Sequence, residues 1–414
     1  MCVKPSTALT ALPILAITEN RSEMANVEFN RKRVPSSMKA FRLICILLLS
    51  VASPLSAQSN SQQSPTPPTT ATGGTNPVVT LDVVVANKAG KPQAGLQEQD
   101  FTLLDNKNPQ KIVSFNSIDE PGSPAVPPVE VVLVIDTVNA APQTVSNERL
   151  QIQKYLRQNG GKLSHPTSVV VFSDSGLKNI GDASLDGNTV AAGLDGNDVT
   201  PLHAMHQASG ENGDFERMMS SVTKLYSLVG FEAKKPGRKV VIWISPGWPL
   251  LASAGNEMYS KGKEQLFSTL AIVSNGLRSA RITLYGIDPE GAGGGEFGRL
   301  QTKDQQFSRT SYESYLKGVP TAKQMMPPNL SLQVLATRSG GRVLLLGNDL
   351  SAQIDDCVSD TKAFYVLSFE GARTEQPNDY HNLELKIDKP GLTVRTSGGY
   401  YAQPEQRPAT SPGK

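Results

Sequence analysis

The chain of 414 residues contains little of what marks a disulfide-stabilised fold, a nucleic-acid binder or a hydrolase. It has 3 cysteines, 4 histidines and a formal net charge of +2. So low a net charge gives no field that would attract nucleic acid or an anionic membrane. Four histidines leave few bases for a Ser-His-Asp arrangement. With 38% hydrophobic and 19% charged residues, the composition excludes global disorder.

The N-terminal part lacks an apolar run long enough to cross a membrane, which takes about 20 residues. It has instead the pattern of a secretory signal: Met38-Lys-Ala-Phe-Arg, an apolar run over 43–52, and the small-residue end Leu55-Ser-Ala57. We predict a signal peptide over 38–57, within an N-terminal extension 1–57, and export to the periplasm or the cell exterior. Translation from Met38 agrees with the irregular composition of residues 1–37. An uncleaved anchor is the alternative.

Cleavage near Ala57 would remove two of the three cysteines, Cys2 and Cys45. Cys357 would remain, and a single cysteine cannot form an internal disulfide. The fold must then be held by its core. Cys357 lies in a helical pattern of apolar and polar residues, which predicts a buried structural thiol.

Two kinds of segment lie before residue 120 and after residue 362: polar segments without large apolar residues, and segments with the pattern of β-strands. Residues 58–77 are rich in Ser, Thr, Pro and Gln and predict a disordered tether, and residues 403–414 predict a frayed tail. A small β unit is expected over 78–119, and a C-terminal β meander over 363–402. The strands expected in these two units are 78–85, 101–104, 111–115, 363–369, 383–387 and 392–396.

Between residues 129 and 362 short apolar runs alternate with helical patterns. A continuous apolar run is typical of a parallel strand buried on both faces. We therefore predict an α/β domain over 129–362 with a doubly wound, mostly parallel sheet and helices on both faces. The expected strands are 131–135, 168–172, 239–244, 281–287 and 342–346. The expected helices are 146–159, 215–229, 257–277, 330–337 and 350–361.

Several segments carry a resemblance to a known family. Val131-Val-Leu-Val-Ile-Asp136 resembles the opening strand of a von Willebrand factor type A (VWFA) domain, and Gly237-Arg-Lys-Val-Val-Ile-Trp-Ile-Ser-Pro-Gly247 resembles its central strand. The ordered set of segments over residues 78–402 is similar to the VWFA-related proteins abundant in Acidobacteria. The set includes Ala94-Gly-Leu-Gln-Glu-Gln-Asp-Phe-Thr-Leu-Leu-Asp105, Ser339-Gly-Gly-Arg-Val, Tyr365-Val-Leu-Ser-Phe and Lys389-Pro-Gly-Leu-Thr-Val-Arg-Thr-Ser-Gly-Gly-Tyr-Tyr401.

This resemblance implies a divalent-metal motif at the carboxyl ends of the strands, but the motif is degenerate. The family pattern is Asp-x-Ser-x-Ser, then a distant Thr, then an Asp at the end of the central strand. Asp136 matches the first Asp and Thr200 the Thr. The two Ser positions hold Val138 and Ala140, and the last Asp position holds Pro246. Mg²⁺ requires nearly octahedral oxygen ligation, which Asp136 and Thr200 alone do not supply.

Three further residues follow predicted strands and carry oxygen atoms that could assist at the same edge: Asp174, Ser245 and Asp288. We therefore expect either no cofactor or a weakly bound divalent cation such as Mg²⁺. The structural alternative is that Asp136 caps the turn after its strand, a common use of Asp.

Other motifs argue against catalysis or nucleotide binding. Residues 293–298 spell G-x-G-x-x-G, but a polar segment follows them where a dinucleotide fold needs a helix. His203 and His206 have no companion Cys or acidic cluster to complete a zinc set. Pro246 after Ser245 removes an N–H that an oxyanion hole would use. We expect no enzymatic activity, with a cell-envelope hydrolase using Ser245 as an alternative.

The leading hypothesis is an exported, adhesion-type module that binds a protein in the cell envelope or outside the cell. Its binding rim would consist of the loops around 136–145, 173–200, 245–256 and 288–328. We expect Asn139 and Trp248 to contact the partner there, with core packing of Trp248 as the alternative. A metal-dependent adhesion domain using Asp136 and Thr200 is the main competing hypothesis. No nucleic-acid partner and no membrane span after signal cleavage are expected.

Overall fold

The computed structural model describes residues 76–119, 128–197, 210–248, 260–289, 312–345 and 349–404. The expected signal peptide, most of the tether, Thr200, His203, His206 and the glycine-rich segment 293–298 lie outside the described residues. Within the described ranges, no helix combines the length and apolar character needed to cross a membrane.

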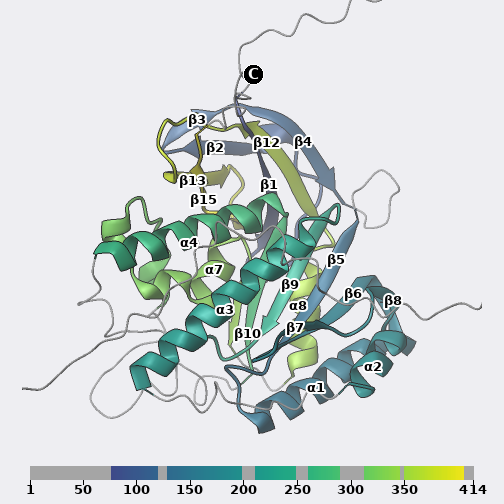
Figure 1. Ribbon diagram of the computed structural model, residues 1–414. Helices are drawn as coiled ribbons and strands as arrows, with labels where there is room; N and C mark the ends of the chain where they lie inside the picture. Colours follow the sequence, from purple (N-terminus) through teal and green to yellow (C-terminus); the bar gives the residue numbers. More distant parts are fainter. Residues whose placement is uncertain are drawn as a thin grey trace, which may run out of the picture. The chain divides into compact units, whose positions relative to one another are not determined.

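A seven-stranded, mostly parallel sheet forms the centre of the fold (Figure 1). Its strands are β5 (Val129–Asp136), β6 (Lys162–Ser173), β7 (Gly176–Asn179), β8 (Ser184–Asp186), β9 (Arg238–Ile244), β10 (Ile282–Asp288) and β11 (Val343–Leu345). The order is β11-β10-β9-β5-β6-β7, and β8 also pairs with β6. β7 and β8 run antiparallel to β6, and the others are parallel. The prediction of a mostly parallel sheet is confirmed.

Helices cover both faces of this sheet, because successive residues of a buried strand point to opposite faces. Val131, Leu133 and Ile135 of β5 pack with one set of helices, whereas Val132 and Val134 pack with the other. The first set is α1 (Pro142–Arg157), α2 (Gly187–Asp195) and α8 (Leu350–Ser359). The second set is α3 (Gly210–Glu232), α4 (Ser260–Ser279) and α7 (Leu332–Arg338).

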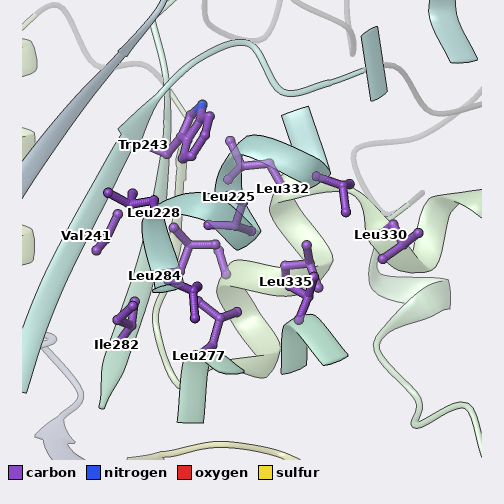
Figure 2. Packing of buried hydrophobic residues seen from close by; sticks show 14 of the residues in the cluster. Leu225, Leu228, Val241, Trp243, Leu277, Ile282, Leu284, Leu330, Leu332 and Leu335 are labelled. Atoms are coloured by element: carbon purple, nitrogen blue, oxygen red, sulfur yellow. The ribbon is translucent and has the colours of Figure 1, made fainter. Parts of the chain in front are cut away.

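The layer on the α3 side combines aliphatic side chains with aromatic ones, among them Trp243 and Trp248. Figure 2 shows Val241 and Trp243 of β9 and Leu284 of β10 in the same layer as Leu225 of α3 and Leu335 of α7. All five side chains are fully or almost fully buried. The short 3-10 helices within the described ranges are η2 (Glu98–Asp100), η3 (Gln158–Gly161), η5 (Tyr312–Tyr315), η6 (Ala322–Gln324) and η7 (Pro327–Leu330).

The N-terminal and C-terminal β segments, predicted as two separate units, share two antiparallel sheets. The first has the order β14-β1-β12-β4, and the second β15-β13-β2-β3. Their strands are β1 (Val78–Asn87), β2 (Phe101–Asp105), β3 (Asn108–Gln110), β4 (Ile112–Ile118), β12 (Phe364–Glu370), β13 (Asp379–Ile387), β14 (Leu392–Arg395) and β15 (Gly399–Ala402). Both sheets contribute to one apolar cluster and thus form a sandwich. Each terminal segment completes its sheets with strands from the other.

The sandwich contacts the amino-terminal ends of the parallel strands. Arg281, just before β10, pairs with Asp82 of β1 at 2.5 Å. Arg395 of β14 pairs at 2.7 Å with Asp360, which follows α8. Since both ion pairs lie toward the strand starts, the carboxyl ends of the strands form the opposite edge of the sheet.

Candidate functional site

The carboxyl edge of the parallel sheet has a topological switch point between β5 and β9. Counted along the chain without β8, the strand order is 3-2-1-4-5-6, as in a common doubly wound fold. The chain leaves β5 toward α1 on one face and leaves β9 toward α4 on the other. Ligands of open α/β sheets bind in the crevice at such a point. Asp136 at the end of β5 and Ser245 just after β9 flank it.

Asp136 is fully buried and hydrogen-bonded through both carboxyl oxygens. Its Oδ1 accepts the backbone N–H of Val138 and that of Asn139, both at 3.0 Å. Its Oδ2 accepts Nδ2 of Asn139 at 2.8 Å and Nε1 of Trp243 at 3.0 Å. The Ser245 hydroxyl lies near this carboxyl and acts to lower its pKa. Asp136 thus holds the loop after β5 against β9.

This arrangement does not fit a divalent cation. A carboxylate has about four lone-pair sites, and the protein's own donors occupy that number on Asp136. Burial raises the pKa of the Asp136 carboxyl, whereas hydrogen bonds from Trp243 and Asn139 and the nearby Ser245 hydroxyl act in the opposite direction. A cation would have to displace N–H groups that point at the same oxygens.

The residues at the two serine positions of the family motif belong to the core. Val138 and Ala140 are both fully buried. Val138 packs in the apolar layer on the α3 side, and Ala140 in the layer on the α1 side. At these two positions the family motif has serine hydroxyls that bind the metal. Here the side chains pack into the two core layers instead.

Asn139 was predicted at the partner-binding rim, and this prediction is wrong. The residue is 7% exposed. Its Nδ2 donates to Asp136 and, at 2.9 Å, to the hydroxyl of Ser221 on α3. The polar side chain turns inward because the buried carboxylate needs donors. Ser221 was missed in the sequence, where it is one hydroxyl within an otherwise helical pattern.

The predicted apolar lip at Trp248 is also wrong, and the alternative of core packing holds. Trp248 is fully buried. Its Nε1 donates to the carbonyl of Leu330 at 2.6 Å, and its ring packs edge-on against Trp243 with centroids 5.3 Å apart. Gly247 has φ of +91°, which is readily available to glycine. This turn after β9 leads Trp248 back into the core.

The three residues expected to assist in metal binding, Asp174, Ser245 and Asp288, differ in burial. Ser245 and Asp288 are each 2% exposed, and Asp174 lies half-buried in the turn between β6 and β7. The backbone N–H of Ser245 donates to the carbonyl of Ile287, which places Ser245 beside the end of β10. In the described ranges, no group of three or more His, Cys, Asp or Glu side chains is arranged to hold a metal ion.

The hydrogen bonds and burial of Ser245 also bear on the alternative hypothesis of a hydrolase that uses this serine. Its Oγ accepts the N–H of Gly247 at 3.1 Å, and the side chain is buried beside Asp136. The histidines within the described residues, His165 and His381, lie at the start of β6 and on β13 of the sandwich. Neither is at the carboxyl edge, so no described histidine serves Ser245 as a base.

A cleft that the sequence did not indicate lies at the amino edge, between α1, β6 and α8. It has a volume of about 300 Å³, and Tyr155, His165, Asp355 and Thr361 line it together with Lys162. His165 is 6% exposed, and its Nε2 lies 2.7 Å from the hydroxyl of Thr361. Burial, together with the charge of Arg238, lowers the pKa of His165 to about 4.

Comparisons with known proteins give only distant likenesses. No protein-family model and no curated protein matches the chain. Among solved structures, the chain is similar to the N-terminal domain of TFIIH p34, with a TM-score of 0.25 and 11% identity over 39% of this chain and 80% of that one. It is also similar to the pilus adhesin SpaC from Lactobacillus rhamnosus GG in its open conformation. That match has a TM-score of 0.27 and 9% identity over 77% of this chain and 47% of that one.

The class of the fold therefore rests on the strand pairing itself. It is a mixed α/β protein, with a mostly parallel sheet covered by helices and two antiparallel sheets packed at one edge.

Proposed function

We propose that this chain is an exported protein-binding module on a VWFA-like domain, and that it binds its partner without a divalent cation. The resemblance of the β5 and β9 segments to that family supports the domain assignment. The buried, fully hydrogen-bonded Asp136 carboxylate is the observation that supports binding without a divalent cation. In a metal-dependent adhesion domain this carboxylate would have to face a cation. Here it stabilises a turn.

Since Asn139 and Trp248 are buried, the proposed contact surface consists of other residues at the carboxyl edge. Among the described residues, the segments that follow the strand ends there are 173–176, 245–248 and Pro289. Ser175 is exposed in the turn between β6 and β7 and marks this rim within the described residues. The sandwich packs at the other edge, so it does not compete for the rim.

Titration calorimetry tests the independence from metal. Mg²⁺, Mn²⁺ and Ca²⁺ are each titrated into the wild type, Asp136→Ala and Asp182→Ala, an exposed aspartate far from the switch point in sequence. We expect the three proteins to give the same heats. A binding heat present in the wild type and in Asp182→Ala, but lost in Asp136→Ala, would establish the metal-dependent alternative.

Site-specific photo-crosslinking tests the binding surface. A photo-reactive residue is placed at Ser175 on the rim or at Asn108 on the sandwich, both exposed. Each protein is mixed with extract of the native cell envelope, with and without EDTA. We expect a discrete crosslinked product from position 175 alone, and the same yield in EDTA. Crosslinking only from position 108, or only without EDTA, contradicts the proposal.

Export is proposed from the signal pattern over 38–57, and sequencing of the mature N-terminus tests it. We expect the protein recovered from the native cells to begin at Gln58. A mature chain that still begins at Met1 or Met38 contradicts cleavage at Ala57.

A further inference from the structure

β4 is an edge strand without charge, proline or glycine, and its ladder is irregular only at its first residues. It pairs with β12 on one side, and among the described residues no strand pairs with its other side (Figure 1). Its seven residues, Ile-Val-Ser-Phe-Asn-Ser-Ile, include no charge, proline or glycine. Natural proteins protect edge strands with these residues, with short length, with bulges or with a covering element. In β4 a bulge affects the first residues alone, and residues 114–118 carry none of these protections.

The other edge strands in the described ranges have such protection. β3 contains Pro109, β7 contains Gly176 and Lys178, and β14 contains Arg395. β11 has three residues, and the four residues of β15 are buried, with Tyr401 hydrogen-bonded to Asn275 of α4. β8 has three residues and contains Asp186. Among these edges, β4 therefore has the longest regular stretch without such protection, residues 114–118.

The open side of β4 also exposes apolar surface. Val113 is 50% exposed. Phe115 is half-buried, with its ring stacked on Tyr365 at 5.7 Å and tilted against Phe101 at 5.5 Å. A strand added beside β4 would cover both side chains and satisfy the outward backbone groups.

The residues of β4 and its flanks are complementary to a second copy of themselves. In an antiparallel self-pair centred on Phe115, Lys111 faces Asp119 of the second copy, and the reciprocal pair forms at the other end. Between them, Ile112 faces Ile118, Val113 faces Ser117, and Ser114 faces Asn116. Lys111 and Asp119 are exposed, and neither forms an ion pair with a described residue. Opposite charges directly across an antiparallel pair are stabilising.

We propose that β4 pairs with β4 of a second copy across a two-fold axis at Phe115, which joins two four-stranded sheets into one continuous sheet. A two-fold interface of this kind uses the same surface on both copies. The ladder with β12 is regular from Ser114 to Ile118, and a register shift at Ser368/Phe369 affects the first residues of β4. The paired segment is short, so the dimer belongs to the weak end of the interface size range.

Sedimentation equilibrium of the full chain over a range of concentrations tests the proposal. The wild type is expected to form a reversible dimer. Lys111→Glu and Asp119→Lys each place like charges opposite one another at both ends, and we expect each to weaken dimerisation about tenfold. The double variant Lys111→Glu/Asp119→Lys restores opposite charges and is expected to recover the wild-type constant. Lys88→Glu, at an exposed turn, makes the same charge change as the control.

Three outcomes of this experiment would contradict the proposed β4–β4 dimer. A wild type that stays monomeric overturns the proposal. So does a dimer that Lys111→Glu and Lys88→Glu affect equally. A dimer that each single variant weakens and the double variant does not restore overturns the register. All substituted positions are exposed, so circular dichroism should show that every variant is folded.

Discussion

At the scale of single residues, the hydrogen bonds of Asp136 determine whether the carboxyl edge of the sheet can bind a cation. An aspartate at the end of a parallel strand can bind a cation or stabilise its own turn, and its neighbours decide which. Here Asn139 and Trp243 direct donors at one oxygen, and the backbone of the turn directs donors at the other. A buried carboxylate is tolerated because all of these hydrogen bonds are made.

Asp136→Ala should therefore destabilise the fold, because it leaves several buried donors unpaired. We expect the free energy of unfolding to fall by ~3 kcal/mol, a few times the ~1 kcal/mol of a single hydrogen bond. Asp136→Asn retains one acceptor oxygen and should lose less. Urea denaturation measures the change, with the exposed Asp182→Ala as the control, expected within ~0.5 kcal/mol of the wild type. Equal stability of Asp136→Ala and wild type would show that the hydrogen bonds are not the residue's role.

His165 makes stability depend on pH. Its pKa is about 4 in the folded protein, because it is buried and near Arg238, and about 6.5 in an unfolded chain. Between these values the unfolded state binds a proton that the folded state does not. Stability is therefore lost as the pH falls from about 6.5 to about 4, by up to ~3 kcal/mol.

Urea midpoints measured across this pH window test the prediction. Carboxyl groups titrate in part of the same range, so the informative quantity is the difference between the wild type and His165→Gln. We expect the variant to lose less stability on acidification. Parallel pH profiles of the two proteins would mean that His165 is protonated in the folded state as readily as in the unfolded state.

At the scale of elements, α1 begins without a side-chain cap. Its N-cap residue is Ala141, in extended conformation, and Pro142 follows at the first turn. Ala141→Ser would supply a side-chain oxygen acceptor at the N-cap position and should stabilise the protein by ~1 kcal/mol. Thermal denaturation measures this, with Ala89→Ser in an exposed turn as the control. An unchanged melting temperature for Ala141→Ser would mean that the backbone N–H groups of the first turn already have partners.

Elements with strong periodicity were predicted well, and short polar ones were missed. The apolar run over 131–135 lies within β5, and the helical pattern over 215–229 lies within α3. β7, β8, α2 and β15 were not predicted. β7 is four residues long and contains glycine, lysine and asparagine, so it has no alternation to detect. α2 is nine residues long and contains two glycines.

At the scale of the whole described part, a buried charge cluster joins the sandwich to the α/β domain. Asp360 is fully buried and accepts the hydroxyl of Tyr285 and Nη2 of Arg395, both at 2.7 Å. Nη1 of Arg238 donates to the backbone carbonyl of Asp360 at 3.2 Å. The cluster thus connects β9, β10 and α8 with β14 of the sandwich.

Removing the fully buried carboxylate of Asp360 should be costly, since it leaves the half-buried Arg395 and the buried Tyr285 hydroxyl without their shared acceptor. We expect Asp360→Ala to lower the free energy of unfolding by ~3–5 kcal/mol. Asp356→Ala removes an exposed partner of Arg342 and should cost less than ~1 kcal/mol. Denaturant unfolding of both variants measures the contrast. Similar losses in the two would show that the Asp360 cluster does not stabilise the junction.

The sequence by itself determined the α/β alternation, the positions of the long elements and the lack of hydroxyl ligands beside Asp136, because periodicity and residue chemistry are local properties. Only the tertiary structure decided that β1 pairs with β12, where Val78 lies opposite Glu370, and that Asn139 and Trp248 point inward. Strand partners and side-chain burial depend on residues far apart in the chain. The periodicity of a segment does not identify which residues from distant parts of the chain pack against it.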